Sequence, residues 1–381
     1  MVDDSELKEE LSNLRRHFHE NPELSDHEFE TTKFLSGYLK KLGFKILTFP
    51  ALKTGVVAEI GPDNSKGVVA LRSDIDALPI LEETGLDYAS KNKGVMHACG
   101  HDFHMASLLG AAILFSENKA KLKNKIRLIF QPAEETHNGA QEVIDAGAVK
   151  DVKAIIGFHN KPDLKSGEVS ILTGGQMAAV DEFNVFIQGK GTHAARPQLG
   201  SDPIIALTNI VNTLQTIVSR NEDPLKTTVL SVTHIEGGYT WNVIPEKTWF
   251  EGTVRTFSAE ARAIAKQRFI DIVEGLSKAL DVNAKINWIE GPEVVNNDRE
   301  LTPLVVEETQ KHFKLVDAEP STAGEDFSFF TNKIPSVFAF IGSEGNSDWH
   351  HSDLIVKDDG LITAVKWYYY SALRIQKYFD K

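Results

Sequence analysis

The spacing of apolar residues along the chain predicts several amphipathic helices. In "SELKEELSNLRRHFHE" at 5–20 they recur every three or four positions, and "NPEL" follows as a stop signal. A second helix is predicted over 26–44, where Gly43 marks its end. Similar patterns predict helices over 101–122, 139–149 and 364–379.

Four short apolar runs predict buried strands. They occupy 67–76, 125–135, 152–160 and 335–343, and each is rich in Val, Ile, Leu or Phe before it turns polar at its C-terminal end. Such runs are typical of strands that are buried on both faces of an α/β sheet. With helices between them, they predict a three-layer α/β/α sandwich.

The middle of the chain has a different order of elements. Strands are predicted at 181–191, 227–238, 247–257 and 283–291, with helices at 202–220 and 259–280. This βαββαβ order is that of the ferredoxin-like unit. Because the sandwich pattern resumes afterwards, we expect one domain from 1–179 and 292–381, with 180–291 inserted into it.

Composition and charge narrow the choice of partners and compartment. The chain has 54 acidic and 41 basic residues, a net charge of −13, and no Lys/Arg cluster, so nucleic acid is not expected to bind. No apolar run approaches the ~20 residues of a membrane span. The single cysteine cannot form an intrachain disulfide, and the acidic start has no signal-peptide pattern, so a cytoplasmic protein is expected.

Aspartate, glutamate, histidine and cysteine residues lie near the ends of the predicted strands. Ligands of open α/β sheets bind beyond the carboxyl ends of the strands. Each residue alone has an ordinary explanation, such as a hydrogen-bonded loop histidine, a helix-capping carboxylate or a small buried cysteine. Their convergence on one sheet edge favours a shared site. The residues are Asp74, Asp76, Glu134, Glu135, His159, His350 and His351, together with "HACGHD" at 97–102.

Cysteine, histidine and carboxylate together suit a divalent metal such as zinc, and also cobalt, nickel or manganese. A structural zinc site would use paired cysteines, so the mixed set indicates an open catalytic site, with room for two ions ~3.5–4 Å apart. As a thiolate, Cys99 has enough lone pairs to bridge two ions. Successive side chains of an extended segment point to opposite sides, so one of Glu134 and Glu135 can bind metal while the other acts as general base.

Several motifs resemble those of the M20 metallopeptidases. The chain resembles the amidohydrolase branch of hippurate hydrolases, N-acetyldiaminopimelate deacetylases and auxin-conjugate hydrolases, from about residue 10 to 375. The motifs are "RRHFHENPELSDHE", "SDIDALPI", "MHACGHDFH", "FQPAEE", "GFHN", "GKGTHAARP", "WNVIP", "EGTVRTF" and "GEDFSFF".

The resemblance implies two divalent metal ions per subunit, zinc, manganese, cobalt or nickel, and Glu134 as general base. Cys99 would bridge the ions. The other implied ligands are His101, Glu135, His159 and His350.

In "WHHSD", His350 fits the family position, but Ser352 replaces the usual proline and leaves His351 as a second candidate. Asp74, where other M20 branches carry a histidine ligand, and His104 are expected to support the ligands without binding metal.

The resemblance also gives roles to the inserted domain, which would serve as lid and dimerisation domain of a homodimer. His193 would hydrogen-bond the scissile carbonyl or its oxyanion in the partner subunit's site, assisted by Asn242. Arg255 would receive the substrate carboxylate, although an arginine on an edge strand can also be simply solvated. The remaining histidines near the helices are expected to be helix or surface residues: His17, His19, His27 and His137.

The implied function is a metal-dependent amidohydrolase of small N-acyl amino acids, which it cleaves to a carboxylic acid and a free amino acid by metal-activated water. A dipeptidase or carboxypeptidase would use the same site chemistry. A catalytically inactive dimeric binding protein is a third interpretation, but the retention of Glu134, the ligand set and His193 argues against it.

Overall fold

The computed structural model describes residues 3–136 and 139–380. Contacts divide the chain into two compact units. The first holds the described residues of Met1–Gln176, Val295–Pro320 and Asp326–Lys381, and the second holds Met177–Val294 and Ser321–Glu325. The sequence had placed 177–179, 292–294 and 321–325 with the first domain, whereas the structure groups these short segments with the second unit.

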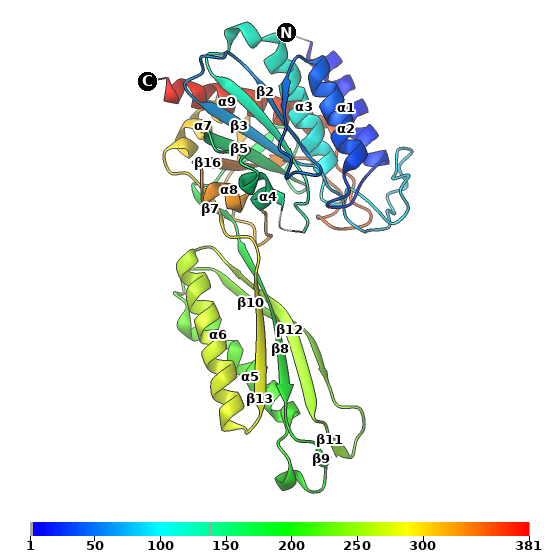
Figure 1. The fold of residues 1–381 in the computed structure, drawn as a ribbon, viewed down its shortest axis with the longest axis vertical. Coiled ribbons are helices and arrows are strands. Elements are labelled where there is room, and N and C mark those ends of the chain that lie inside the picture. The colour runs from blue at the N-terminus through cyan, green and yellow to red at the C-terminus, as the bar shows by residue number, and fades with distance from the viewer. Residues whose placement is uncertain (1–2, 137–138, 381) are drawn as a thin grey trace. The chain divides into compact units, whose positions relative to one another are not determined.

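The first unit is the predicted α/β sandwich (Figure 1). Its eight-stranded sheet has the order β1-β2-β4-β3-β5-β16-β6-β15. The strands are β1 (Lys45–Leu47), β2 (Val56–Ile60), β3 (Val68–Asp74), β4 (Lys125–Gln131), β5 (Val152–Lys161), β6 (Glu168–Ser170), β15 (Lys314–Leu315) and β16 (Ser336–Gly342), with β7 (Gly174–Met177) and β14 (Val295–Asn297) forming a separate pair.

Helices cover both faces of this sheet. They are α1 (Asp4–Glu20), α2 (Phe29–Lys41), α3 (His101–Glu117), α4 (Gly139–Asp145), α7 (Leu301–Gln310), α8 (Ser328–Thr331) and α9 (Leu361–Phe379), with short 3-10 turns at Lys119–Lys121 and Asp358–Gly360. Successive residues of β3 point to opposite faces: Leu71 belongs to the core shared with α1, α3 and α9, whereas Arg72 lies against Phe327, just before α8.

Packing in the hydrophobic core accounts for the pattern of buried residues in α1 and α3. In α1, Leu7, Leu11, Leu14 and Phe18 are buried along one face, as the amphipathic pattern predicted. In α3 every residue from His101 to Phe115 is buried, because α1 and α9 pack against it. A helix that is buried all round can carry polar groups into the interior only where they find partners.

The four predicted strands determine where the site lies. The strands β4, β3, β5 and β16 are neighbours and run parallel. Their carboxyl ends therefore share one edge of the sheet, and the chain leaves β3 at Asp74 and β4 at Gln131 on this edge. His159 lies near the end of β5.

The second unit has the predicted ferredoxin-like order. A four-stranded antiparallel sheet, ordered β10-β12-β8-β13, packs against α5 and α6 (Figure 1). Asp202 caps α5 by accepting hydrogen bonds from the amides of Ile204 and Ile205, and Ser258 caps α6. The elements are β8 (Ala179–Gln188), α5 (Pro203–Leu214), β10 (Thr228–Gly237), β12 (Lys247–Thr256), α6 (Ala259–Ala279) and β13 (Asn283–Glu290), with a ribbon of β9 (Thr192–His193) and β11 (Val243–Ile244), a 3-10 turn at Pro197–Leu199 and a π-helical turn at Ile217–Asn221.

Within the described residues, no helix combines the length and the apolar character that a bilayer span requires.

Candidate metal centre

Several groups of candidate ligand atoms lie at the sheet edge of the first unit, and two of them share Cys99. One ligand atom from each of Cys99, His101 and His159 lies within 4.8 Å of the others, and the same holds for Cys99, Glu135 and His350. The Cys99 Sγ is 3.3 Å from the His159 Nε2. Cys99 is common to both groups, which is the arrangement that a sulfur bridging two cations requires.

Gly100 allows the chain to bring Cys99 and His101 to the same place. It has φ +89°, a left-handed conformation that side chains with a Cβ rarely adopt. A Cβ at this position would stand 2.2 Å from the Asn160 Nδ2, which itself donates a hydrogen bond to the Cys99 carbonyl at 2.6 Å. The glycine of "ACGH" is therefore required both by its backbone conformation and by the close approach of β5.

The two imidazoles beside Cys99 are oriented by hydrogen bonds from their Nδ1 atoms. The His101 Nδ1 lies 2.9 Å from the Asp76 carbonyl, and the His159 Nδ1 lies 2.8 Å from the Asn160 carbonyl. A carbonyl only accepts, so each Nδ1 carries a proton, and in the neutral imidazole each Nε2 keeps its lone pair. This is the tautomer that binds a metal through Nε2.

Unpartnered polar atoms provide a test of whether a cation fits. The His101 Nε2 and the Glu135 Oε1 are buried without a hydrogen-bond partner among the described residues, and they are 3.9 Å apart. Burying a lone pair and a carboxylate oxygen without a partner is costly. Both atoms, together with the soft sulfur nearby, fit a borderline-soft divalent cation.

His104 and Asp74 lie beside the ligand groups and are occupied by other partners. The His104 Nδ1 donates to the Asp74 Oδ1 at 2.6 Å, and its Nε2 accepts from the Asn160 amide at 2.8 Å, so neither nitrogen is available to a metal. Burial alone would raise the pKa of Asp74, but His101, His104 and Arg72 hold the pKa of this carboxyl well below its usual range.

The two glutamates after β4 have different hydrogen-bond and ion-pair partners, although one carboxylate oxygen of each lies within 4.8 Å of a His101 nitrogen. The Glu134 Oε1 accepts from the Asp326 amide at 3.3 Å, whereas the Glu135 Oε2 is 3.6 Å from the His350 Nε2. Both glutamates follow Ala133, which has φ +54°, a left-handed conformation that costs a residue with a Cβ roughly 1–2 kcal/mol.

Arg72 and Asp326 connect Glu134 with the rest of the site. Arg72 is fully buried and donates to the Asp74 Oδ2 and the Asp326 Oδ1, at 2.7 Å each. The "GEDFSFF" motif was part of the family resemblance, but its sequence gave no signal that Asp326 would hold Glu134. That contact joins residues 192 positions apart.

The backbone distinguishes His350 from His351. His350 has φ +64°, and its amide donates to the Ala98 carbonyl at 2.9 Å, next to Cys99. This places His350 in a ligand group, whereas His351 belongs to none among the described residues. Trp349 packs edge-on against the His159 ring, with 4.6 Å between the ring centroids.

One histidine that we expected to be a helix or surface residue is buried. His19 lies in α1, but only 2% of its side chain is exposed. Its Nδ1 is 2.9 Å from Asp102 and its Nε2 is 3.1 Å from Glu82. The helical pattern treated position 19 as polar and solvated, because its acidic partners lie 63 and 83 residues away.

The other histidines of this set differ from His19. His17 and His27 are exposed, and His137 lies outside the described residues. His97 of "HACGH", which we assigned no role, is buried and has no hydrogen-bond partner in the described part of the chain.

In the second unit, His193 and Asn242 lie side by side on the β9–β11 ribbon. Val243 pairs with His193, and the Ala194 amide donates to the Asn242 carbonyl at 3.0 Å. The Ala195 amide donates to the His193 Nδ1 at 3.1 Å. In the neutral imidazole the proton is therefore on Nε2, which makes this exposed atom a hydrogen-bond donor.

Arg255 lies in β12, on the face of the sheet that the helices do not cover. The neighbouring arginine, Arg262, forms a bidentate pair with Asp181. No ion pair to Arg255 occurs within the described ranges. Burial lowers the pKa of Arg255, and Asp181 opposes this effect. A half-buried guanidinium with its fork available is suited to a carboxylate ligand.

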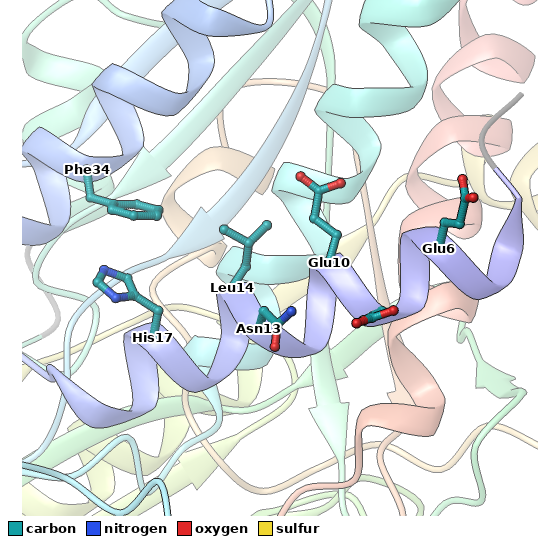
Figure 2. Close-up of a pocket in the computed structure, with 7 residues that line it drawn as sticks. Glu6, Glu10, Asn13, Leu14, His17 and Phe34 are labelled. Atoms are coloured by element: carbon teal, nitrogen blue, oxygen red, sulfur yellow. The ribbon is translucent and has the colours of Figure 1, made fainter.

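A separate hollow of about 500 Å³ lies between α1 and α2 (Figure 2). Six of its lining residues come from α1, and Phe34 of α2 stacks against His17. The lining residues are Glu6, Glu9, Glu10, Asn13, Leu14, His17 and Phe34, and none of them belongs to the predicted site. We assign the hollow no function.

Comparisons with known proteins identify the family of this chain. Residues 70–374 match the profile of peptidase family M20/M25/M40. The N-acetyl-L-cysteine deacetylase of Bacillus subtilis (strain 168) is 51% identical over 372 residues, which cover 97% of this chain and 89% of that protein. An N-acetylcysteine deacetylase of the same strain is 44% identical over 359 residues, or 94% of each chain. A solved structure, the YxeP protein of Bacillus subtilis, a dinuclear metal binding peptidase from the M20 family, matches with a TM-score of 0.89 and 40% identity, covering 98% of this chain and 99% of that one.

Proposed function

Because the chain belongs to peptidase family M20/M25/M40, as its sequence motifs predicted, we propose that it is a metal-dependent amidohydrolase of N-acyl amino acids. It cleaves the amide bond and releases a carboxylic acid and a free amino acid. The observation that carries the proposal is the pair of ligand groups that share Cys99.

The proposed ligands of two divalent cations are Cys99 as the bridge with His101, Glu135, His159 and His350. Cations held there would polarise the amide carbonyl and lower the pKa of a water molecule. Zinc, manganese, cobalt and nickel all suit this donor set. A thiolate ligand is retained best in a reducing compartment, which supports a cytoplasmic location.

Glu134 is the proposed general base. Its carboxylate is held by the Asp326 amide, away from His350. From this position it would take a proton from the attacking water and deliver it to the leaving nitrogen, and positioned groups of this kind contribute ~10²–10⁴ in rate. Glu135, one residue further, faces the histidine ligands.

The second unit is proposed to bind the substrate as part of a homodimer. The His193 Nε2 proton would stabilise the oxyanion that forms on the amide carbonyl, with Asn242 beside it. Arg255 would bind the carboxylate of the substrate through two parallel hydrogen bonds. His193 acts in the partner subunit's site in this proposal.

The test is a panel of amide substrates assayed after the metal has been removed and one cation has been restored. Two relatives are N-acetylcysteine deacetylases, so N-acetylcysteine and other N-acetyl amino acids come first, followed by benzoyl and indole-acetyl amino acids and by dipeptides. We expect turnover of N-acyl amino acids only with metal, and loss of metal stoichiometry in Cys99→Ala. Faster cleavage of dipeptides would support a carboxypeptidase, and full activity in metal-free protein would refute the proposal.

A further inference from the structure

Glu28 is a fully buried carboxylate outside the proposed ligand set. It stands directly before α2, at the position where a side chain commonly caps a helix, but it makes no capping hydrogen bond. The Glu23 carboxylate performs that role instead, accepting from the amides of Glu30 and Thr31. The Glu28 carboxylate is therefore directed elsewhere.

Its two oxygens join three distant segments. The Glu28 Oε1 accepts from the Ala133 amide at 2.8 Å, and the Oε2 accepts from the Thr54 hydroxyl at 2.8 Å. Ala133 is 105 residues away in the sequence and immediately precedes Glu134. Thr54 is also buried.

The bond to Ala133 falls at the strained point of the site. Ala133 is left-handed, at φ +54°, and its carbonyl accepts from the Gly139 amide at 3.2 Å. Two residues later, the Glu135 amide donates to the Asp76 Oδ2 at 3.0 Å. Buried carboxylates thus hold the backbone on both sides of Glu134.

We propose that Glu28 is a positioning residue, which fixes the turn at Ala133 and so directs the Glu134 carboxylate toward its catalytic position. The inference rests on the proposed role of Glu134 as general base. Glu28 itself touches neither the ligand atoms nor the reacting groups that this role implies.

Burying the Glu28 carboxylate costs folding free energy. Burial and the charge of Asp76 raise the pKa of Glu28, hydrogen bonds from Ala133 and Thr54 lower it, and the net result is a pKa of about 7. An apolar residue would pack here at lower cost, and the carboxylate gains only the hydrogen bonds that it makes.

The experiment compares Glu28→Ala with a matched control, Glu23→Ala, in the metal-loaded protein. Each variant loses one carboxylate that accepts two hydrogen bonds near α2, but only Glu28 contacts the base-bearing turn. We expect kcat to fall at least tenfold in Glu28→Ala with KM and metal content unchanged, since small displacements of a catalytic group can cost ~10²-fold. Glu23→Ala should lower the unfolding temperature and leave kcat within about twofold of the original protein.

Two further variants keep the test decisive if Glu28→Ala folds poorly. In Glu28→Gln, the amide oxygen can still accept from Ala133, so kcat should lie between those of Glu28→Ala and the original protein. Glycine adopts positive φ freely, so Ala133→Gly combined with Glu28→Ala should recover part of the lost kcat. Hydrogen exchange of the Ala133 amide should accelerate in Glu28→Ala, a readout that needs no activity.

The outcomes separate this inference from the proposed function. If the original protein is active and Glu134→Gln is inactive, but Glu28→Ala matches Glu23→Ala in kcat, then Glu28 is not a positioning residue. The inference is also overturned if metal content falls in parallel with kcat. If the original protein hydrolyses no amide with any metal, the proposed function fails, and hydrogen exchange still decides whether Glu28 holds Ala133.

Discussion

The buried imidazole of His19 should make the stability of the first unit depend on pH in the alkaline range. Both of its ring nitrogens face carboxylate oxygens, those of Asp102 and Glu82, so both must donate and the ring must be an imidazolium. Burial alone would lower the pKa of His19, but the hydrogen bonds to Asp102 and Glu82 outweigh it and raise the pKa to about 9. The unfolded chain has the ordinary histidine pKa of ~6.5.

The sign and size of the effect follow from these two values. A group whose pKa is raised on folding stabilises the folded state fully below the unfolded pKa, and this contribution disappears as the pH rises through the folded pKa. The window therefore runs from about pH 6.5 to about pH 9. At ~1.36 kcal/mol per pH unit, His19 contributes about 3 kcal/mol at pH 6 that is lost above pH 9.

The assay is urea unfolding of the first unit at pH 6 and pH 9.5, in the original protein and in His19→Gln. Glutamine keeps a hydrogen-bond donor but does not titrate, so the difference between the two proteins isolates the imidazole from all other groups. We expect the free energy of unfolding to differ by about 3 kcal/mol more at pH 6 than at pH 9.5. An equal difference at both pH values would refute the argument that His19 is held as an imidazolium.

Three predictions concern the proposed chemistry. Glu134→Gln should keep the metal and lose kcat by ~10²–10⁴, measured by metal content and turnover, and loss of metal in this variant but not in Glu135→Gln would reverse the assignment. Arg255→Lys keeps the charge but removes the fork, so affinity should fall for free-acid substrates and change little for amidated analogues, and equal effects on both would contradict the role. His193→Ala and Glu134→Ala should each be nearly inactive, since loss of an oxyanion donor alone costs ~10²–10³ in kcat. Their heterodimer should regain activity at one site, and a verified heterodimer without activity would mean that His193 does not act in the partner subunit.

The sequence predicted the elements whose apolar pattern is long and regular. The strands β3, β4, β5 and β16 and the helices α1, α3, α6 and α9 all occur where the pattern placed them. It did not predict β2 or α7, which have five and ten residues. The strands β1, β6 and β15 were not predicted either, because they have only two or three residues each, and so few positions establish no periodicity. Pairing with a neighbouring strand defines these elements, and that information is not local.

The site shows the same difference between local patterns, which the sequence reveals, and contacts between distant segments, which it does not. The residue types and the strand ends placed the ligand candidates at one edge, because parallel strands bring their carboxyl ends together whatever the loops between them do. The contacts of Glu28, Arg72 and His19 could not be predicted, since each joins segments that are far apart in the sequence. The left-handed backbone at His350, which brings this histidine to Glu135, also has no signature in "WHHSD".

Because the chain contains one cysteine and two of the ligand groups share it, thiol chemistry would report on the proposed metal centre alone. Each chain contributes one thiol, so the number of thiols titrated equals the number of proposed centres, and no other sulfhydryl group interferes. A thiolate whose lone pairs bind cations reacts slowly with alkylating reagents, whereas a thiolate without cations is the stronger nucleophile. The rate of modification of Cys99 would therefore report on how many of the proposed centres hold metal, without an activity assay.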